Sequence, residues 1–160
     1  MKRTVKVLKH SEDAKIIVSD KGDCYDLVAC EDITLLPNAV TLVSLGLSIK
    51  LPSGCSAKIY DRSSTPLKKG YKIANSVGII DNNYAGNEDI WKYAALSITA
   101  TKKSPINIKA GDKICQFEIC LSQKATVWQK LKWLFTSGYN FKYVNSLENS
   151  NRDGFGSTGN

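Results

Sequence analysis

The C-terminal residues 152–160, with the sequence RDGFGSTGN, combine groups that can hold a nucleotide. Glycines let backbone N–H groups come close to a ligand, and the planar fork of Arg152 suits phosphate oxygens. Phe155 offers a flat face for a base, and the hydroxyls of Ser157 and Thr158 add donors. The same composition is typical of a disordered terminus. Taken alone, this segment indicates either a nucleotide clamp on a mobile tail or an unstructured end.

Two further groups could bind phosphate. Arg62, Ser63 and Ser64 follow a segment with strand character, where charge-assisted hydrogen bonds to phosphate would contribute about 1.5–3 kcal/mol each. The alternative is an exposed turn with a surface salt bridge. Gln116 ends the segment GDKICQ and points away from an apolar row. It could bond a phosphate or a catalytic water, or simply face solvent.

Residues 75–86, NSVGIIDNNYAG, predict a hairpin with functional groups at its rim. There, Asn75 can read a polar base edge, Asp81 can act as a base and Tyr84 can pack against a sugar. Alternatively, Asp81 only forms the turn. Asp26 stands inside an apolar strand, where an unpaired carboxylate would be costly. It therefore needs either water-mediated contact with Mg²⁺ or a structural salt bridge.

The segments that must position these groups show mainly a period of two. In residues 45–51, apolar side chains alternate with glycine and polar residues, which predicts a strand with one buried face. Further predicted strands cover residues 4–8, 25–29, 34–36, 55–59, 77–80, 91–98 and 115–121. Many short strands joined by polar turns indicate an all-β barrel or jelly roll.

One stretch departs from this pattern, because Trp128, Leu131, Leu134 and Phe135 recur at helical spacing. It predicts a short helix near residues 128–136. The apolar stripe could pack on the barrel or on a neighbouring subunit, or it could be a docking surface for a partner or a membrane interface.

Composition narrows the function classes. A chain of 160 residues with a formal charge of +7 predicts one domain and an anionic partner. Its basic residues are scattered, which favours a small phosphorylated ligand over stable nucleic-acid binding. The five cysteines form no CxxC pair and only one histidine is present, which argues against a zinc site and predicts reduced thiols. With no signal peptide or membrane-spanning run, we expect a cytoplasmic protein without membrane association.

The order and spacing of five motifs resemble the trimeric dUTP diphosphatase (dUTPase) family. The motifs are CYDL at 24–27, RSS at 62–64, residues 75–86, GDKICQ at 111–116 and GFGSTG at 154–159. The resemblance implies a distorted jelly-roll barrel that forms a homotrimer, with active sites where subunits meet. It also implies Mg²⁺-dependent hydrolysis of dUTP to dUMP and pyrophosphate, which limits uracil incorporation into DNA and supplies dUMP for thymidylate synthesis.

The resemblance also implies roles for individual residues. Asp81 would orient and deprotonate the water that attacks the α-phosphate. The other implied roles are phosphate binding by Arg62, Ser63, Ser64 and Gln116, water-mediated metal contact by Asp26, uracil recognition by Asn75, Gly78, Ile79 and Ile80, and contact with the deoxyribose by Tyr84.

The tail would close over the bound nucleotide, with Phe155 stacking on uracil and Arg152, Gly156, Ser157 and Thr158 binding the nucleotide. Two features depart from the family pattern. Arg152 stands closer to Phe155 than the usual tail arginine, and the link from Gln116 to Phe155 is longer and contains the predicted helix.

These motifs predict a barrel domain over 1–144 and a flexible lid over 145–160, with residues 122–144 as a possible protein-binding segment. Two other functions remain open. A dCTP deaminase shares the fold, but it needs a glutamate base where this chain has Cys120. A nucleotide-sensing or protein-binding module could use the helical segment, but it would have no need of Asp81.

Overall fold

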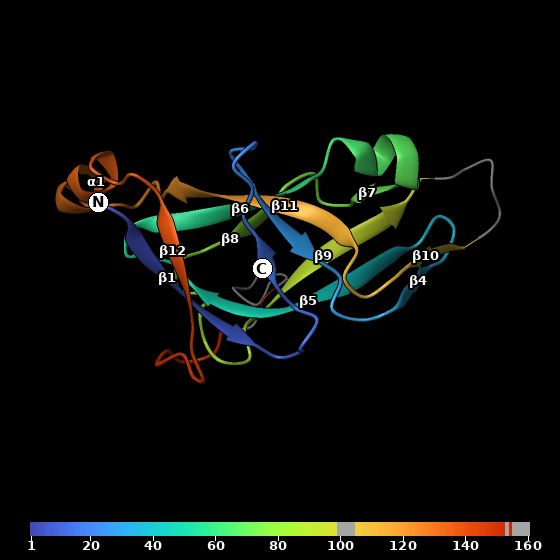
Figure 1. The fold of residues 1–160 in the computed structure, drawn as a ribbon, viewed down its shortest axis with the longest axis horizontal. Coiled ribbons are helices and arrows are strands. Elements are labelled where there is room, and N and C mark those ends of the chain that lie inside the picture. The colour runs from blue at the N-terminus through green and yellow to red at the C-terminus, as the bar shows by residue number, and fades with distance from the viewer. Residues whose placement is uncertain (99–104, 153, 155–160) are drawn as a thin grey trace, which may run out of the picture.

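The computed structural model describes residues 1–98, 105–152 and 154 and consists mainly of β-strands (Figure 1). The strands are β1 (Arg3–Lys9), β2 (Ile16–Ile17), β3 (Tyr25–Val28), β4 (Ile33–Leu35), β5 (Val40–Lys50), β6 (Cys55–Asp61), β7 (Tyr71–Ile73), β8 (Gly78–Ile80), β9 (Ile90–Ser97), β10 (Ile106–Ile108), β11 (Lys113–Leu121) and β12 (Tyr139–Tyr143). The helical elements are the π-helical turn η1 (Thr65–Lys69) and the α-helix α1 (Val127–Leu134).

Two five-stranded sheets form the body of the molecule, in the orders β12-β1-β5-β9-β7 and β2-β3-β11-β6-β8. Strands that follow one another in sequence alternate between the sheets, since β5, β7 and β9 lie in the first and β6 and β8 in the second. A third, two-stranded sheet pairs β10 with β4. Two packed sheets with such crossings form a distorted jelly roll, which confirms the predicted fold class.

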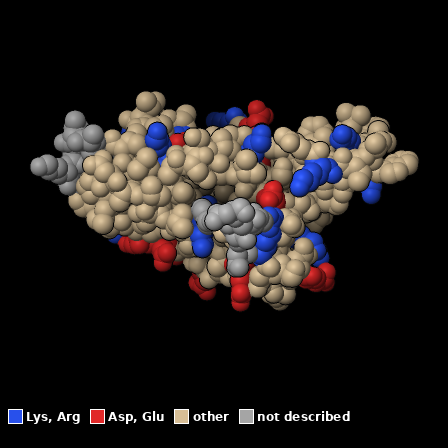
Figure 2. Space-filling view, turned by 180° about the vertical axis from the view of Figure 1, so that it is seen from behind, with Lys and Arg blue, Asp and Glu red and all other residues tan. Residues whose placement is uncertain are grey.

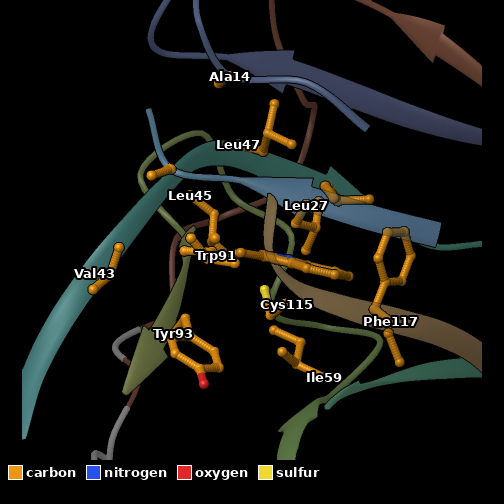
Figure 3. Close-up of a cluster of buried hydrophobic side chains, with 14 of the residues drawn as sticks. Ala14, Leu27, Val43, Leu45, Leu47, Ile59, Trp91, Tyr93, Cys115 and Phe117 are labelled. Atoms are coloured by element: carbon orange, nitrogen blue, oxygen red, sulfur yellow. The ribbon is translucent and has the colours of Figure 1, made fainter. Parts of the chain in front are cut away.

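The core lies between the sheets, where side chains of β5, β9 and β11 meet (Figure 3). Trp91 and Phe117 are fully buried and pack edge to face, with ring centroids 5.3 Å apart. Burying one such side chain contributes about 1.5–3 kcal/mol. This packing fixes β9 against β11, and the polar side chains at the ends of these strands take their positions from it.

The predicted strand 45–51 is buried on both faces rather than on one. β5 reaches back to Val40, and Gly46 and Ser48 are buried like Leu45 and Leu47 beside them. The register with β9 shifts between Ser44 and Ser48, and Gly46 has φ +62°. A Cβ on Gly46 would come within 2.9 Å of the Cys30 Cβ. The alternation therefore marks a bulge, and the prediction of a single buried face was wrong.

The predicted helix is present as α1, with a capping box in which Thr126 and Gln129 bond each other's backbone N–H groups. Figure 1 shows it at one end of the molecule, beside the N-terminus. Gln129 also donates to Ser53 Oγ at 2.6 Å, which fixes the polar side of the helix to the β5–β6 turn. None of the helix residues is buried, and Trp128 is 76% exposed. Within this chain, the apolar stripe thus does not pack on the barrel.

All five cysteines are free thiols, as predicted. In the described part of the chain, no helix has the length and apolar character needed to span a membrane.

Candidate active site

The segment 75–86 follows a different path from the predicted hairpin. It leaves β7 in the first sheet, forms β8 in the second and returns to the first as β9. β8 pairs with β6, through Ala57↔Ile80 and Ile59↔Gly78, and not with a neighbouring strand in sequence. The hairpin prediction was therefore wrong in its pairing, because the turn residues connect two sheets.

This crossing encloses a cavity of about 200 Å³, which we call the β8 pocket. Its lining includes every member of this segment for which the sequence predicts nucleoside binding: Asn75, Gly78, Ile79, Ile80 and Tyr84. Gly154 also lines it, and a Cβ on that glycine would lie 3.4 Å from the Tyr84 ring. A cavity smaller than the usual 300–1,000 Å³ of drug-sized ligand sites suits a single base and its sugar.

Asp81 lies outside the β8 pocket, on the rim of a larger hollow of about 680 Å³ between the start of β6 and the segment after β11. Its carboxylate accepts a hydrogen bond from Arg152 Nη1 at 3.0 Å, and the same nitrogen bonds Asn83. The backbone N–H of Arg152 donates to Asp89 Oδ1 at 2.7 Å. The candidate base and the candidate tail arginine therefore meet within one chain.

A second group of predicted residues gathers where β3, β6 and β11 run side by side, and we call it the strand-end cluster. Asp26 pairs with Arg62 Nε at 2.8 Å and with Lys113 Nζ at 2.9 Å, and only 15% of its side chain is exposed. Gln116 lies opposite Asp26 in the β3–β11 register and donates to the Asp61 carbonyl at 3.0 Å. The predicted need of the Asp26 carboxylate for a cationic partner is thus met by two side chains, Arg62 and Lys113.

Asp61, which sequence reasoning missed, supports this cluster from behind. Its carboxylate accepts from the Tyr93 hydroxyl and, at 2.8 Å, from the Ile73 N–H. Burial, reinforced by the hydrogen bond to Asp61, raises the pKa of Tyr93 far above its ordinary value, so that the phenol remains a neutral donor. The end of β6, and with it Arg62, is thereby fixed to the core.

The two predicted serines of the second motif lie between β6 and η1. Ser63 is exposed, and Ser64 is the N-cap residue of η1 but makes no capping hydrogen bond with its side chain. Phe155, Gly156, Ser157 and Thr158 of the predicted tail clamp lie outside the described residues.

Strand geometry separates Asp81 from the strand-end cluster. The pair Ala57↔Ile80 places Asp81 beside Ser56, near the start of β6, whereas Arg62 follows the last residue of that strand. Six residues at about 3.3 Å each separate the two positions by roughly 20 Å. A general base must lie within hydrogen-bond reach of its proton. A single chain therefore cannot bring Asp81 to a phosphate held by Arg62 and Gln116.

The structure adds residues to the β8 pocket that the sequence did not reveal. Lys92 and Ala94 of β9 line it, while the alternate residues Trp91 and Tyr93 are buried in the core. The alternation along β9 could have shown that Lys92 and Ala94 share a face. It could not have shown that β7 and β8 lie over that face, because this pairing joins distant segments.

Charges on the surface are dispersed. Figure 2 shows Lys and Arg side chains in separate groups, with Asp and Glu among them, on one face of the molecule. No continuous basic track crosses that face, as a bound nucleic-acid strand would favour.

Comparison with known proteins agrees with this geometry. The family model described as dUTPase matches residues 16–159. The SPbeta prophage-derived deoxyuridine 5'-triphosphate nucleotidohydrolase YosS of Bacillus subtilis (strain 168) is 35% identical over 159 residues, which cover 99% of both chains. The deoxyuridine 5'-triphosphate nucleotidohydrolase of Hydrogenobaculum sp. (strain Y04AAS1) is 32% identical over 162 residues, again 99% of both.

Solved structures share the fold. The dUTPase from Streptococcus mutans superposes with a TM-score of 0.67 at 24% identity, covering 78% of this chain and 99% of that one. A mutant dUTPase from phage phi11 of S. aureus, whose structure is described as revealing the coordination of a structural Mg(II) ion, gives 0.66 at 19% identity and covers 78% and 95%. From the family match and the two full-length relatives, the chain belongs to the dUTPase family.

Proposed function

We propose that this protein hydrolyses dUTP to dUMP and pyrophosphate as a homotrimer whose active sites each combine two half-sites from different copies. The nucleoside half-site is the β8 pocket with Asp81, and the phosphate half-site is the strand-end cluster with Ser63 and Ser64. The observation that carries the proposal is the separation of Asp81 from Arg62, which is roughly 20 Å along β6. Because Asp81 and Arg62 of one chain lie too far apart, each active site would combine the nucleoside half-site of one copy with the phosphate half-site of another.

The nucleoside half-site suits uracil and deoxyribose. The narrow β8 pocket places the backbone of Gly78, Ile79 and Ile80 beside the side chain of Asn75, so that amide groups can bond the polar edge of the base. Tyr84 closes one side, and its hydroxyl donates to the Ile90 carbonyl at 3.2 Å, which fixes the ring. A fixed ring against the sugar leaves little room for a 2′-hydroxyl, and tight walls exclude the thymine methyl.

The phosphate half-site concentrates positive charge on a rigid sheet. Arg62 can turn its free guanidinium nitrogens to phosphate while Nε remains on Asp26. Ser63, Ser64 and the amide of Gln116 would hold further oxygens.

The residues of the phosphate half-site are compatible with a Mg²⁺ ion that is bound through water. Both oxygens of Asp26 already accept from cations, and no cluster of metal-ligating side chains occurs in the described residues. Asp26 would therefore hold the ion through its waters, and substrate phosphates would supply direct ligands, as Mg²⁺ commonly requires. A bound ion would neutralise charge on the phosphate chain.

Asp81 would perform the proton transfer. A water between Asp81 and the α-phosphorus gives its proton to the carboxylate and forms a new P–O bond, while the bond from the α-phosphorus to the bridging oxygen breaks and pyrophosphate leaves. Arg152 Nη1 lies 3.0 Å from the Asp81 carboxylate. It would supply positive charge beside the substrate phosphates that the phosphate half-site of the other copy holds.

Deamination of dCTP is less compatible with this site. The resemblance to a dCTP deaminase would require a glutamate base at the position that Cys120 occupies. Burial, together with the neighbouring Glu118, raises the pKa of the Cys120 thiol to about 11. The thiol is therefore protonated near neutral pH and cannot serve as that base. A cytoplasmic location remains a prediction.

The proposed reaction is tested by measuring pyrophosphate release from dUTP, dCTP, dTTP and UTP, with ammonia release followed in parallel. We expect Mg²⁺-dependent pyrophosphate from dUTP at a rate at least about a hundredfold above the other three. The pocket excludes the methyl of dTTP and the 2′-hydroxyl of UTP, and the amide groups beside Asn75 would bond the polar edge of uracil and not that of the cytosine in dCTP. Ammonia from dCTP would select the deaminase, and binding of dUTP without any product would select a sensing module.

A further inference from the structure

We propose that Asn82 is a positioning residue for Asp81. Its side chain ties the segment that carries the candidate base to the β5–β6 turn, residues 51–54, and so fixes where the carboxylate lies. The inference rests on the proposed function and deepens it. With this tie, a base that is largely exposed to solvent keeps the position that attack on the α-phosphate requires.

The side chain of Asp81 is held only weakly by its own contacts. It is 60% exposed, and its hydrogen bond with Arg152 Nη1 at 3.0 Å lies open to solvent. Exposed ion pairs restrain a side chain little, because water competes for both partners. A fixed position of the carboxylate must therefore come from the backbone on either side of it.

On the N-terminal side, the strand ladder holds this backbone. Ile80 pairs with Ala57 in the β6–β8 register, and Asp81 is the first residue after β8. The register ends with this pair, so the ladder fixes Asp81 from one side only. Another contact has to fix the chain on the other side.

On the C-terminal side, the side chain of Asn82 continues the attachment to β6. Its Nδ2 donates to the carbonyl of Cys55, the first residue of β6, at 2.8 Å and to the Pro52 carbonyl at 2.9 Å. A primary amide has two N–H donors, and here both are used at one turn. Asn82 is half-buried, so these hydrogen bonds are better shielded from water than the one between Asp81 and Arg152.

The β5–β6 turn is itself held by two other segments. The Ser122 N–H, just after β11, donates to the Gly54 carbonyl at 2.9 Å, and Gln129 Nε2 of α1 donates to Ser53 Oγ at 2.6 Å. Gly54 has φ +78°, and a Cβ on it would come within 2.6 Å of the Gln129 Cβ. A side chain that is tied to this turn is therefore tied to a fixed part of the fold.

The two asparagines after Asp81 have different partners. Asn83 is exposed and accepts a hydrogen bond from Arg152, whereas Asn82 donates to the barrel. Both residue types are common in turns, so the sequence alone does not distinguish them. The contacts assign the positioning role to Asn82.

Two variants of Asn82 test this role. Asn82→Ala removes the side chain amide, and Asn82→Asp keeps its size but has no N–H donor when ionised. Each should lower kcat for dUTP about 10–30-fold, because a displaced base loses its alignment with the attacking water. Affinity for a non-hydrolysable dUTP analogue with Mg²⁺, measured by calorimetry, should change less than about threefold. If the alanine variant does not fold, the aspartate variant of equal size carries the test.

The matched control is another asparagine that bonds a neighbouring segment. Asn107 of β10 is exposed and accepts from Thr34 Oγ1 at 3.0 Å, in the two-stranded sheet that contains neither half-site. Asn107→Ala should keep kcat within about twofold. Retention of kcat within about twofold in the Asn82 variants as well would overturn the proposal. A loss that appears only in the affinity for the analogue would also overturn it.

A double variant separates positioning from general support of the fold. In the Asp81→Asn background, Asn82→Ala should lower the single-turnover rate less than about twofold further, because the group that it misplaces no longer accepts a proton. An equal loss of about 10–30-fold in both backgrounds would show a structural role alone and contradict the assignment.

Failure of the proposed function would look different. If the wild-type protein released no pyrophosphate from dUTP, both the proposed function and the role of Asn82 would be wrong. If the wild-type protein is active and the Asn82 variants match it, only the role of Asn82 is refuted.

Discussion

The phosphate half-site and the nucleoside half-site are built by different means. The first sits on three neighbouring strands, where the rows Asp26↔Gln116 and Gln116↔Tyr60 place its groups by sheet register. The second is formed by a segment that crosses between sheets, and Arg152 and Gly154 of the same chain border it. Charge binding thus relies on a rigid sheet, and base recognition relies on a loop segment. Sites on strands hold geometry more firmly than sites on loops.

The two half-sites also differ in the burial and pairing of their carboxylates. Asp26 has a side chain only 15% exposed and two cationic partners, whereas Asp81 has a side chain 60% exposed and one. Removing one partner of a buried pair commonly costs about 3–5 kcal/mol, while exposed pairs contribute about 0–1 kcal/mol. Substitutions in the phosphate half-site should therefore affect both activity and stability, and those at Asp81 mainly activity.

Replacing the candidate base should have the largest effect. Asp81→Asn keeps an oxygen for Arg152 but cannot accept a proton, so kcat should fall by about 10³-fold. Affinity for a non-hydrolysable dUTP analogue, measured by calorimetry with Mg²⁺, should change less than about threefold. The control is Asp20→Asn at an exposed turn. Activity retained within tenfold would mean that another group activates the water.

Replacing Arg62 should have the second-largest effect. Arg62→Lys keeps the charge but loses the Nε bond to Asp26 and the planar fork, so kcat/KM for dUTP should fall about 10–100-fold. Unlike Asp81→Asn, it should also lower the free energy of unfolding, measured in urea, by about 1–3 kcal/mol. Arg3→Lys, whose guanidinium bonds Ser53 and Cys55 instead, is the matched control. Equal activity of the two variants would remove Arg62 from the site.

Removing the hydrogen bond by which Tyr93 supports the phosphate half-site should have a smaller effect. Tyr93→Phe removes the hydrogen bond to Asp61 and should destabilise the fold by about 1–3 kcal/mol. It should raise KM a few-fold, because Arg62 and Gln116 lose part of their fixed geometry, and leave Asp81 chemistry unchanged. Tyr143→Phe, at an exposed position that ends β12, is the control. A drop in kcat with constant KM would contradict this division of roles.

The smallest effect is expected away from both half-sites. Trp128→Ser combined with Leu134→Ser removes apolar surface that is exposed in the chain. If α1 is a docking surface for another protein, kcat for dUTP should remain within about twofold and the trimer should survive gel filtration with light scattering. Dissociation of the trimer would show instead that α1 packs on a neighbouring subunit.

Much of this architecture was predictable because its signals are local. Period-two patterns placed eight strands, and helical spacing placed α1. The cost of a buried carboxylate required partners for Asp26, which the structure supplies from Arg62 and Lys113. The third motif also contains residues that line the β8 pocket, and these could be identified without knowledge of the strand pairing.

Other features depend on contacts between segments far apart in sequence. The strands Tyr71–Ile73 and Ile106–Ile108 are too short for a periodic signal, and β12 gains its place only by pairing with β1. The sequence does not reveal the roles of Asp61 and Asp89, because a carboxylate at a strand end or in a loop looks the same in sequence whether it faces solvent or accepts hydrogen bonds from distant segments. The division into a barrel over 1–144 and a lid over 145–160 stays a prediction.

The most direct test of the shared site is the rate of dUTP hydrolysis by trimers reassembled from Asp81→Asn and Arg62→Ala chains at varied ratios. We predict a maximum of about one quarter of the wild-type rate at equal amounts, falling to the parental rates at either extreme, because each working site needs one intact half from each variant. A rate that stays at the sum of the parents at every ratio, although light scattering with distinguishable tags shows mixed trimers, would contradict the account.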